Sequence, residues 1–175
     1  MKTETAANIL GALAQAVTDA VSDAIVEDRG CSESSAAALV HLAKYRDETI
    51  DALRRPLGLS HPGCVRLIDR LEETELVARG EGSDRRTRAL RLTRTGKAEA
   101  RALLRARGEV LAEVIAVLSA AERRTFARLA SKILGSLVED VDDGLAVCRL
   151  CDYESCPDED CPVSKTLQPR AGSAS

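Results

Sequence analysis

A capped amphipathic helix is followed directly by a basic, glycine-rich hairpin in residues 54–92, and few small folds accommodate that order. Gly58 can adopt the left-handed conformation of a tight turn, and Ser60 is a suitable N-cap for a helix that continues to Glu72. The apolar side chains of this helix recur on one face, at Cys64, Leu67, Ile68 and Leu71. This pattern predicts a helix-turn-helix over residues 47–74.

The segment after this helix has the pattern of a β-hairpin. Leu76-Val77-Ala78 and Ala89–Leu92 can pair as strands, with the glycine-rich tip Gly80–Asp84 between them. We therefore expect residues 76–92 to form a wing beside the helix. Helix-turn-helix and wing together predict a mainly α-helical fold of the winged helix-turn-helix class.

Helical periodicity continues on both sides of this module. Residues 6–27 predict a long amphipathic helix, and residues 33–55 contain two shorter ones. Residues 95–142 predict two further helices, the second of which begins at the capping box Ser119–Glu122. Because the long N- and C-terminal helices exceed what a small module needs to cover itself, we expect them to form a dimerisation region within one domain, residues 6–142.

The distribution of charge indicates the kind of partner. Residues 54–107 contain fourteen Arg or Lys and seven Asp or Glu, whereas residues 139–161 contain nine acidic residues and a single Arg. Aromatic residues make up only 2% of the chain, so its core must consist of aliphatic side chains, as in packed helices. A basic middle and an acidic end predict that the middle contacts nucleic acid and that the end stays away from phosphate.

The side chains expected to contact DNA lie on the second helix of the helix-turn-helix and on the wing. The first residues of such a helix reach base edges in the major groove, an arginine on its outer face can bond guanine through two hydrogen bonds, and a wing arginine can enter the minor groove. The alternatives are solvated charge and a hairpin whose charges keep its edges from pairing. The candidates are Ser60, His61, Gly63, Arg66, Arg70, Arg85, Arg86 and Arg88.

Four cysteines near the C-terminus have the spacing Cys-x2-Cys-x4-Cys-x4-Cys. This spacing suits a tetrahedral sulfur site and is similar to that of zinc knuckles, with Cys where their His stands. Structural zinc, an iron–sulfur cluster or thiol pair that senses redox state, and unliganded thiols are the alternatives. We expect residues 143–164 to form a metal-binding tail and residues 165–175 to be disordered; the candidate ligands are Cys148, Cys151, Cys156 and Cys161.

No catalytic set of residues is apparent. His41 and His61 are the only histidines, and the chain has no glycine loop of the kind that binds phosphate. A thiol oxidoreductase built on Cys148 and Cys151 is a remote alternative, because no alternating strand and helix pattern surrounds the pair. We therefore expect a protein that is not an enzyme.

The first apolar stretch, residues 9–26, does not have the layout of a secretory signal. It is interrupted by Asp19 and Asp23, which makes it too polar to be expected to span a bilayer. The expected location is the cytoplasm, where thiols stay reduced and a disulfide framework is a poor explanation of the cysteines.

Over residues 6–140 the chain resembles the MarR family of bacterial winged-helix regulators. The resemblance is carried by LRRPLGLSHPGCVRLIDRLEETELVARG and DRRTRALRLTRTGKA, and most specifically by Asp84-Arg85-Arg86 followed by Leu90, Leu92, Thr93 and Gly96. It implies a homodimer that binds a pseudo-palindromic operator in double-stranded DNA and represses transcription until a small molecule or an oxidant releases it. The alternative is the same fold with the cysteine tail as a redox-responsive or metal-responsive input.

Overall fold

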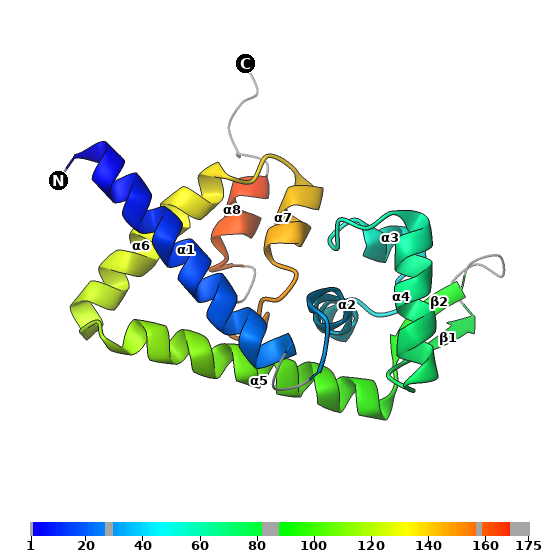
Figure 1. The fold of residues 1–175 in the computed structure, drawn as a ribbon. Coiled ribbons are helices and arrows are strands. Elements are labelled where there is room, and N and C mark those ends of the chain that lie inside the picture. The colour runs from blue at the N-terminus through cyan, green and yellow to red at the C-terminus, as the bar shows by residue number, and fades with distance from the viewer. Residues whose placement is uncertain (1, 27–29, 82–87, 157–158, 169–175) are drawn as a thin grey trace, which may run out of the picture.

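The computed structural model describes residues 2–26, 30–81, 88–156 and 159–168. Within them the chain forms helices and one antiparallel hairpin (Figure 1). This is the mainly α-helical class with a β-hairpin that the sequence predicts. The elements are α1 (Thr3–Val26), α2 (Glu33–Lys44), α3 (Ile50–Arg54), α4 (His61–Glu73), β1 (Val77–Glu81), β2 (Arg88–Leu92), α5 (Arg94–Ala116), α6 (Ala120–Ser136), α7 (Val141–Val147) and α8 (Pro162–Leu167).

Hydroxyl side chains fix where most of these helices begin. In each of five helices the N-cap oxygen accepts a hydrogen bond from the backbone N–H three residues later, which satisfies a donor that the helix leaves unpaired. At Ser119, Glu122 also binds back to the cap, as the predicted capping box requires. α5 begins at Arg94, one residue before the predicted start at 95. The five N-caps are Ser32, Thr49, Ser60, Thr93 and Ser119.

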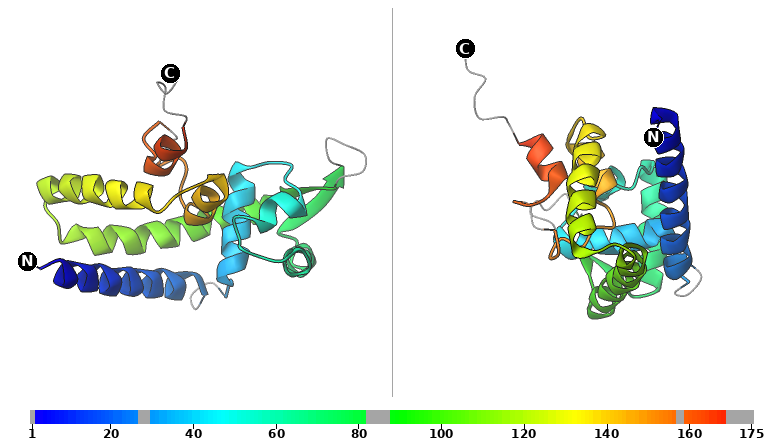
Figure 2. Two further views of the ribbon diagram at one scale, coloured as in Figure 1. Left: turned by 90° about the horizontal axis from the view of Figure 1, so that it is seen from above. Right: turned by 90° about the vertical axis from the view of Figure 1, so that its left-hand side faces the viewer.

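α5 connects two parts of the molecule. One part, the head, contains α2, α3, α4 and the hairpin. The other part is an arm that extends away from the head and consists of α5, of α1, which packs against α5, and of α6, which follows α5 (Figure 2). The core of the head is aliphatic, as the low aromatic content requires, and α5 contributes to it at its N-terminal half. Its most deeply buried side chains include Leu39, Leu53, Cys64, Leu67, Ile68, Leu90 and Leu103.

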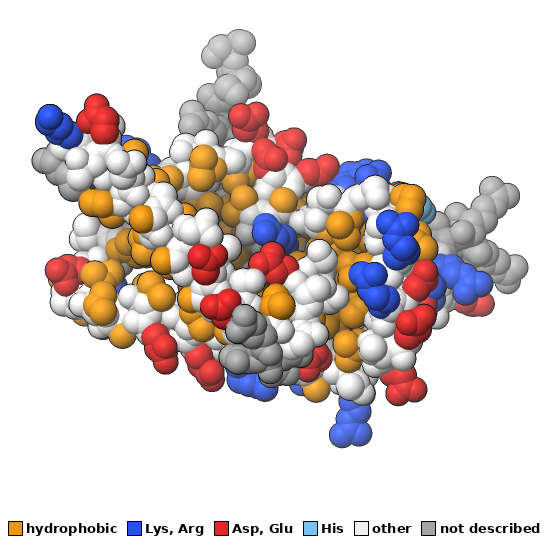
Figure 3. All heavy atoms as spheres, in the orientation of Figure 1, with side chains coloured by type: hydrophobic (Ala, Val, Ile, Leu, Met, Phe, Trp, Pro, Cys, Tyr) orange, Lys and Arg blue, Asp and Glu red, His pale blue; other side chains and the backbone are white. Residues whose placement is uncertain are grey.

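The arm leaves apolar side chains uncovered on α1 and α6. Ile9, Leu10 and Leu13 on α1 are 40–55% exposed, and Phe126, Leu129 and Ile133 on α6 are 44–47% exposed. Figure 3 shows hydrophobic side chains gathered over this end of the molecule. A contiguous apolar surface of this kind marks an interaction site in a soluble protein.

α1 is long and apolar enough, by length and composition alone, to cross a membrane. The expectation that this stretch is too polar to do so is therefore wrong, because Asp19 and Asp23 are outweighed by the run of Ala, Val, Leu and Ile around them. Core helices of soluble proteins meet the same criterion. Here α1 packs against α5 and α2.

The C-terminal segment contains more helix than the sequence predicts. α7 spans residue 142, where we expected the domain to end, and α8 continues to Leu167, so residues 165–167 are helical rather than disordered. α8 packs on α6 closely enough that a methyl group added at Gly135 would lie 2.8 Å from the Thr166 hydroxyl. Residues 169–175 lie outside the described part of the chain.

His41 is a packing residue of the head and is only 3% exposed. Its ring lies 4.6 Å from the ring of Tyr45, and within the described part of the chain its Nδ1 has no hydrogen-bond partner. Burial lowers the pKa of His41 from 6.5 to about 4. The imidazole is therefore neutral in the folded protein at neutral pH.

Stability should consequently fall as the pH is lowered from 6.5 to about 4, since only the unfolded state gains the proton in that range. Between about pH 7.5 and about pH 5, we expect protonation of His41 in the unfolded state to lower the free energy of unfolding by roughly 2 kcal/mol, since one pKa unit corresponds to about 1.4 kcal/mol. Urea unfolding of the wild type and of His41→Gln at both pH values measures this loss of unfolding free energy. The variant should lose less stability than the wild type; an equal loss in both would show that His41 is not the group responsible.

Candidate nucleic-acid interface

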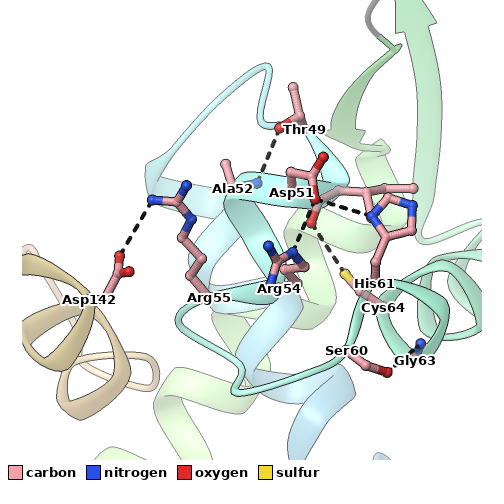
Figure 4. A network of polar contacts seen from close by, with 11 residues as sticks. Thr49, Asp51, Ala52, Arg54, Arg55, Ser60, His61, Gly63, Cys64 and Asp142 are labelled. Atoms are coloured by element: carbon pink, nitrogen blue, oxygen red, sulfur yellow. Dashed lines mark hydrogen bonds and ion pairs between the residues drawn. The ribbon is translucent and has the colours of Figure 1, made fainter.

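The turn between α3 and α4 has the conformation that the sequence predicts. Gly58 has φ +61°, in the left-handed region, and Leu57 and Leu59 on either side of it pack against the core of the head. The backbone N–H of Gly63 donates to Ser60 Oγ at 3.2 Å (Figure 4). The N-terminus of α4 is thereby capped while the Ser60 hydroxyl keeps its own proton to donate.

α4 presents its predicted polar face to solvent. Cys64, which donates from Sγ to the Ile50 carbonyl oxygen at 3.7 Å, is buried with Leu67, Ile68 and Leu71 on the opposite face. Burial raises the pKa of the Cys64 thiol, as expected of an inert core cysteine. The exposed candidates are Ser60, His61, Arg66 and Arg70, with Gly63 half-buried among them.

His61 is held by a residue that the sequence analysis did not identify. Asp51 Oδ1 accepts from Arg54 Nε at 3.0 Å and lies 3.1 Å from His61 Nδ1 (Figure 4). The hydrogen bonds from Arg54 and then from His61 lower the pKa of Asp51 below its usual value. The Asp51 carboxylate therefore orients the imidazole at the start of α4, with Nε2 as its remaining polar atom.

The hairpin pairs Val77 with Leu92 and Glu81 with Arg88. β1 therefore runs through Gly80 and Glu81, which the sequence analysis placed in the tip. Arg88 is exposed at the end of β2 nearest the tip. Arg85 and Arg86, the other two wing candidates, lie outside the described residues.

Arg79 ties the hairpin to α4, and the sequence analysis missed it. Its guanidinium donates to Asp69 Oδ1 at 2.8 Å and binds the Glu72 carboxylate, and its backbone N–H donates to Glu72 Oε1 at 3.1 Å. The carboxylates of Asp69 and Glu72, three residues apart on α4, were the available signal for a basic partner, but they do not indicate which arginine it is. This pairing leaves Arg66 and Arg70 as the basic groups on the outer face of α4.

A second set of contacts fixes β2. The Leu90 N–H donates to the Glu48 carbonyl oxygen at 2.7 Å, and Arg91 forms an ion pair with Asp47. The hairpin is thus held from both strands, by α4 on one side and by the segment after α2 on the other. These contacts consequently hold α4 and the hairpin together as one surface.

A cleft of about 1010 Å³ lies between α2, α5 and residues 152–154. Basic side chains outnumber acidic ones on its walls, and Leu104 and Tyr153 add apolar surface. Such a cleft suits a small organic anion better than a neutral or cationic ligand. The basic side chains are Lys44, Arg46, Arg91, Lys97, Arg101 and Arg105.

The four C-terminal cysteines lie together in a small second core. Cys148 is the C-cap of α7 and Cys161 the N-cap of α8, and both are buried, whereas Cys151 and Cys156 are half-buried on the loop between these helices. The Cys151 N–H donates to the Cys148 carbonyl oxygen at 2.9 Å, which closes a tight turn between the first two thiols. Val138 and Val163 complete this core.

The thiols also interact with one another. The Cys148 thiol interacts most strongly with Cys151 and also with Cys161, and Cys156 interacts with Cys161. The interaction between Cys148 and Cys151 raises the pKa of Cys148 and lowers that of Cys151 to about 6, with help from Arg107. Among the described residues, no three His, Cys, Asp or Glu side chains already form a metal-ligand group. The structure therefore brings the four predicted ligands together without preforming a site.

Comparison with protein-family models gives no match, and comparison with curated proteins gives none either. Solved structures do match. A MarR family protein from Bacillus stearothermophilus is 24% identical, with a TM-score of 0.69 over 79% of this chain and 99% of that one. MepR, a transcription regulator of the Staphylococcus aureus multidrug efflux pump MepA, is 17% identical, with a TM-score of 0.66 over 75% and 98%.

A third match is the Mycobacterium tuberculosis MarR family protein Rv2887 in complex with salicylic acid. It is 24% identical, with a TM-score of 0.57 over 71% of this chain and 93% of that one. The chain therefore has the MarR-type winged-helix fold. Each of these three matches leaves at least a fifth of the chain uncovered.

Proposed function

We propose that this protein is a sequence-specific regulator of transcription that binds double-stranded DNA, and that it is not an enzyme. The observation that carries the proposal is the reading surface: the outer face of α4, with Arg66 and Arg70, is locked to a basic hairpin through Arg79. A helix with this exposure enters the major groove, and the hairpin then lies over the flanking backbone or minor groove. Solved structures with this fold include named transcription regulators, which supports the same conclusion.

We further propose a cytoplasmic homodimer, without membrane contact, that represses transcription from a pseudo-palindromic operator. The uncovered apolar faces of α1 and α6 support the dimer, because a second copy would bury them in a two-fold symmetric interface. Two heads related by a two-fold axis read two half-sites of inverted sequence.

Release by a small organic anion completes the proposal. The basic cleft between α2 and α5 supports it, since a ligand there would contact both Arg91 of β2 and Arg101 of α5. The salicylic acid complex of Rv2887 is an example of this ligand class on a protein of the same fold. A ligand that binds the cleft of the DNA-free form better than that of the bound form would lower DNA affinity.

Selection of bound sequences from a random double-stranded library, followed by affinity measurement on the selected operator, tests the proposal. Arg66→Ala should weaken operator binding roughly 10- to 100-fold, about 1–3 kcal/mol, and relax the preference for one base pair per half-site. The reason is the loss of a guanidinium that contacts a base edge.

Arg124→Ala is the matched control. Arg124 is exposed on α6, a helix remote from the reading surface (Figure 1), and at 100° per residue it falls on the side of α6 opposite Phe126 and Leu129. The Arg124→Ala protein should bind the operator with the affinity of the wild type. Failure to select any sequence would contradict specific DNA binding, and an Arg66→Ala protein with unchanged affinity would remove Arg66 from the interface.

A further inference from the structure

The C-terminal segment around the four cysteines, residues 141–167, contacts both parts of the molecule. We propose that Cys148, Cys151, Cys156 and Cys161 bind one Zn²⁺ ion and that the metal-bound segment braces the DNA-reading head against the arm. The zinc part of this inference does not depend on the proposed function.

The mutual contacts of the thiols favour a single ion. Four sulfurs that each lie 2.3 Å from a tetrahedral zinc are about 3.8 Å apart, which is the separation of sulfur atoms in van der Waals contact. Cys148 and Cys161 are buried in one small cluster and Cys151 and Cys156 pack against it, so the four thiols can gather around one ion without a change of fold. An iron–sulfur cluster places iron and sulfide between its cysteines and would have to force these thiols apart.

The surroundings of the thiols are suited to thiolate charge. The Val163 and Ser164 backbone N–H groups hydrogen-bond to Cys161, and Arg107 of α5 interacts electrostatically with Cys151. Four thiolates and one Zn²⁺ carry a net charge of about −2, so hydrogen bonds and a nearby cation stabilise the metal-bound form. Outer groups of this kind orient the ligands of structural metal sites.

The segment has few other means of holding its shape. Within the described residues the core around this segment has only four buried side chains, and two of these are Cys148 and Cys161. Zinc binding supplies the folding free energy of small peptides that have no fold without it. A bound ion would therefore add to the order of residues 148–156 and 159–161.

Contacts on the head side come from three points of the segment. Asp142 on α7 lies 3.8 Å from the Arg55 guanidinium at the end of α3 (Figure 4). Leu150 packs against the core of the head. Tyr153 donates from its hydroxyl to the Cys148 carbonyl oxygen at 3.2 Å and places its ring 3.7 Å from Lys44 Nζ and 6.1 Å from the Tyr45 ring.

On the arm side, α8 packs on α6. Because Cys161 is the N-cap of α8 and Cys148 the C-cap of α7, a metal that joins them also joins the arm to the head. The position of the head relative to the dimerisation surface thus depends on an intact site.

Elemental analysis of the full chain, purified without chelator under reducing conditions, tests the metal. We expect about one zinc per chain in the wild type and in Cys31→Ser, a control cysteine outside the cluster, and well below half of that in Cys151→Ser and Cys156→Ser. Cobalt added to the metal-free wild type should give the visible and near-ultraviolet bands of a tetrahedral thiolate site. This measurement does not depend on whether the variants fold. Iron with sulfide, or no zinc and no cobalt spectrum, would overturn the zinc site.

Hydrogen exchange before and after zinc removal tests the brace. Amides of α8 and of Tyr45 at the end of α2 should exchange about tenfold faster or more without the metal, while Leu67 and Ile68 in α4 keep their rates. Tyr153→Ala should keep its zinc but lose the protection at Tyr45. If zinc removal frees α8 and leaves Tyr45 unchanged, the metal organises only the tail and the brace is wrong. Neither readout involves DNA, so failure here is distinct from failure of the proposed function.

Discussion

Gly96→Ala should destabilise the protein by on the order of 3 kcal/mol or more, because the first turn of α5 approaches the backbone of the hairpin too closely for a methyl group. A Cβ at Gly96 would lie 2.9 Å from the Leu76 carbonyl carbon and closer still to its oxygen. That oxygen also accepts from the Thr93 N–H at 3.1 Å. The Leu76 carbonyl belongs to the backbone and is already hydrogen-bonded to Thr93, the N-cap of α5. Neither this carbonyl nor the first turn of α5 can therefore shift without a loss of stability.

Gly108→Ala, in the same helix, is the matched control. Nothing lies within 4 Å of a Cβ built at Gly108, so the substitution only removes the conformational freedom of a helical glycine. It should stabilise the protein by about 0.5–1 kcal/mol. Urea unfolding of both variants measures the difference. A Gly96→Ala variant as stable as the wild type would mean that the contact between α5 and the hairpin relaxes without loss of packing.

Leu129→Glu should leave the protein monomeric and lower its operator affinity by about 100-fold or more. Leu129 lies between Phe126 and Ile133 on the exposed apolar side of α6, and α1 of the same arm has a similar exposed face. A carboxylate there would have to be desolvated in the proposed dimer, and a monomer holds only one of the two half-sites. Sedimentation and operator titration give the two readouts.

Arg124→Glu introduces the same carboxylate on the opposite side of α6 and should remain dimeric. A wild-type protein that is monomeric at micromolar concentration, or a Leu129→Glu protein that still dimerises, would rule out this surface as the interface. Both variants are expected to keep their helical content, since each site is exposed within a single chain.

The features that could be predicted from the sequence are those that nearby residues determine. The N-caps at Ser60 and Ser119, the turn at Gly58 and the buried face of α4 depend on residues within one or two helical turns, and the structure has them as expected. The tip of the hairpin was placed too early because glycine is common in tips, whereas Gly80 pairs with Ala89 inside the strands.

The features that could not be predicted depend on contacts between distant segments. Nothing local distinguishes Arg79 from the other arginines of the basic region; its pairing with Asp69 and Glu72 follows from how the hairpin folds back along α4. Likewise, Asp51 reaches His61 only after the turn has formed. The length of α8 was missed because a short helix that begins at Pro162 is supported by packing on α6 rather than by its own periodicity.

A single continuous helix, α5, carries the head at one end and meets α6 at the other. Its length determines how far the head moves when the angle of the arm changes. Its 23 residues span about 35 Å at 1.5 Å per residue. A swing of about 10° at the arm would displace the head by roughly 6 Å, close to two base-pair steps of 3.4 Å each. In the proposed dimer, angular changes of this size would therefore be large enough to bring two heads into or out of register with a fixed pair of half-sites.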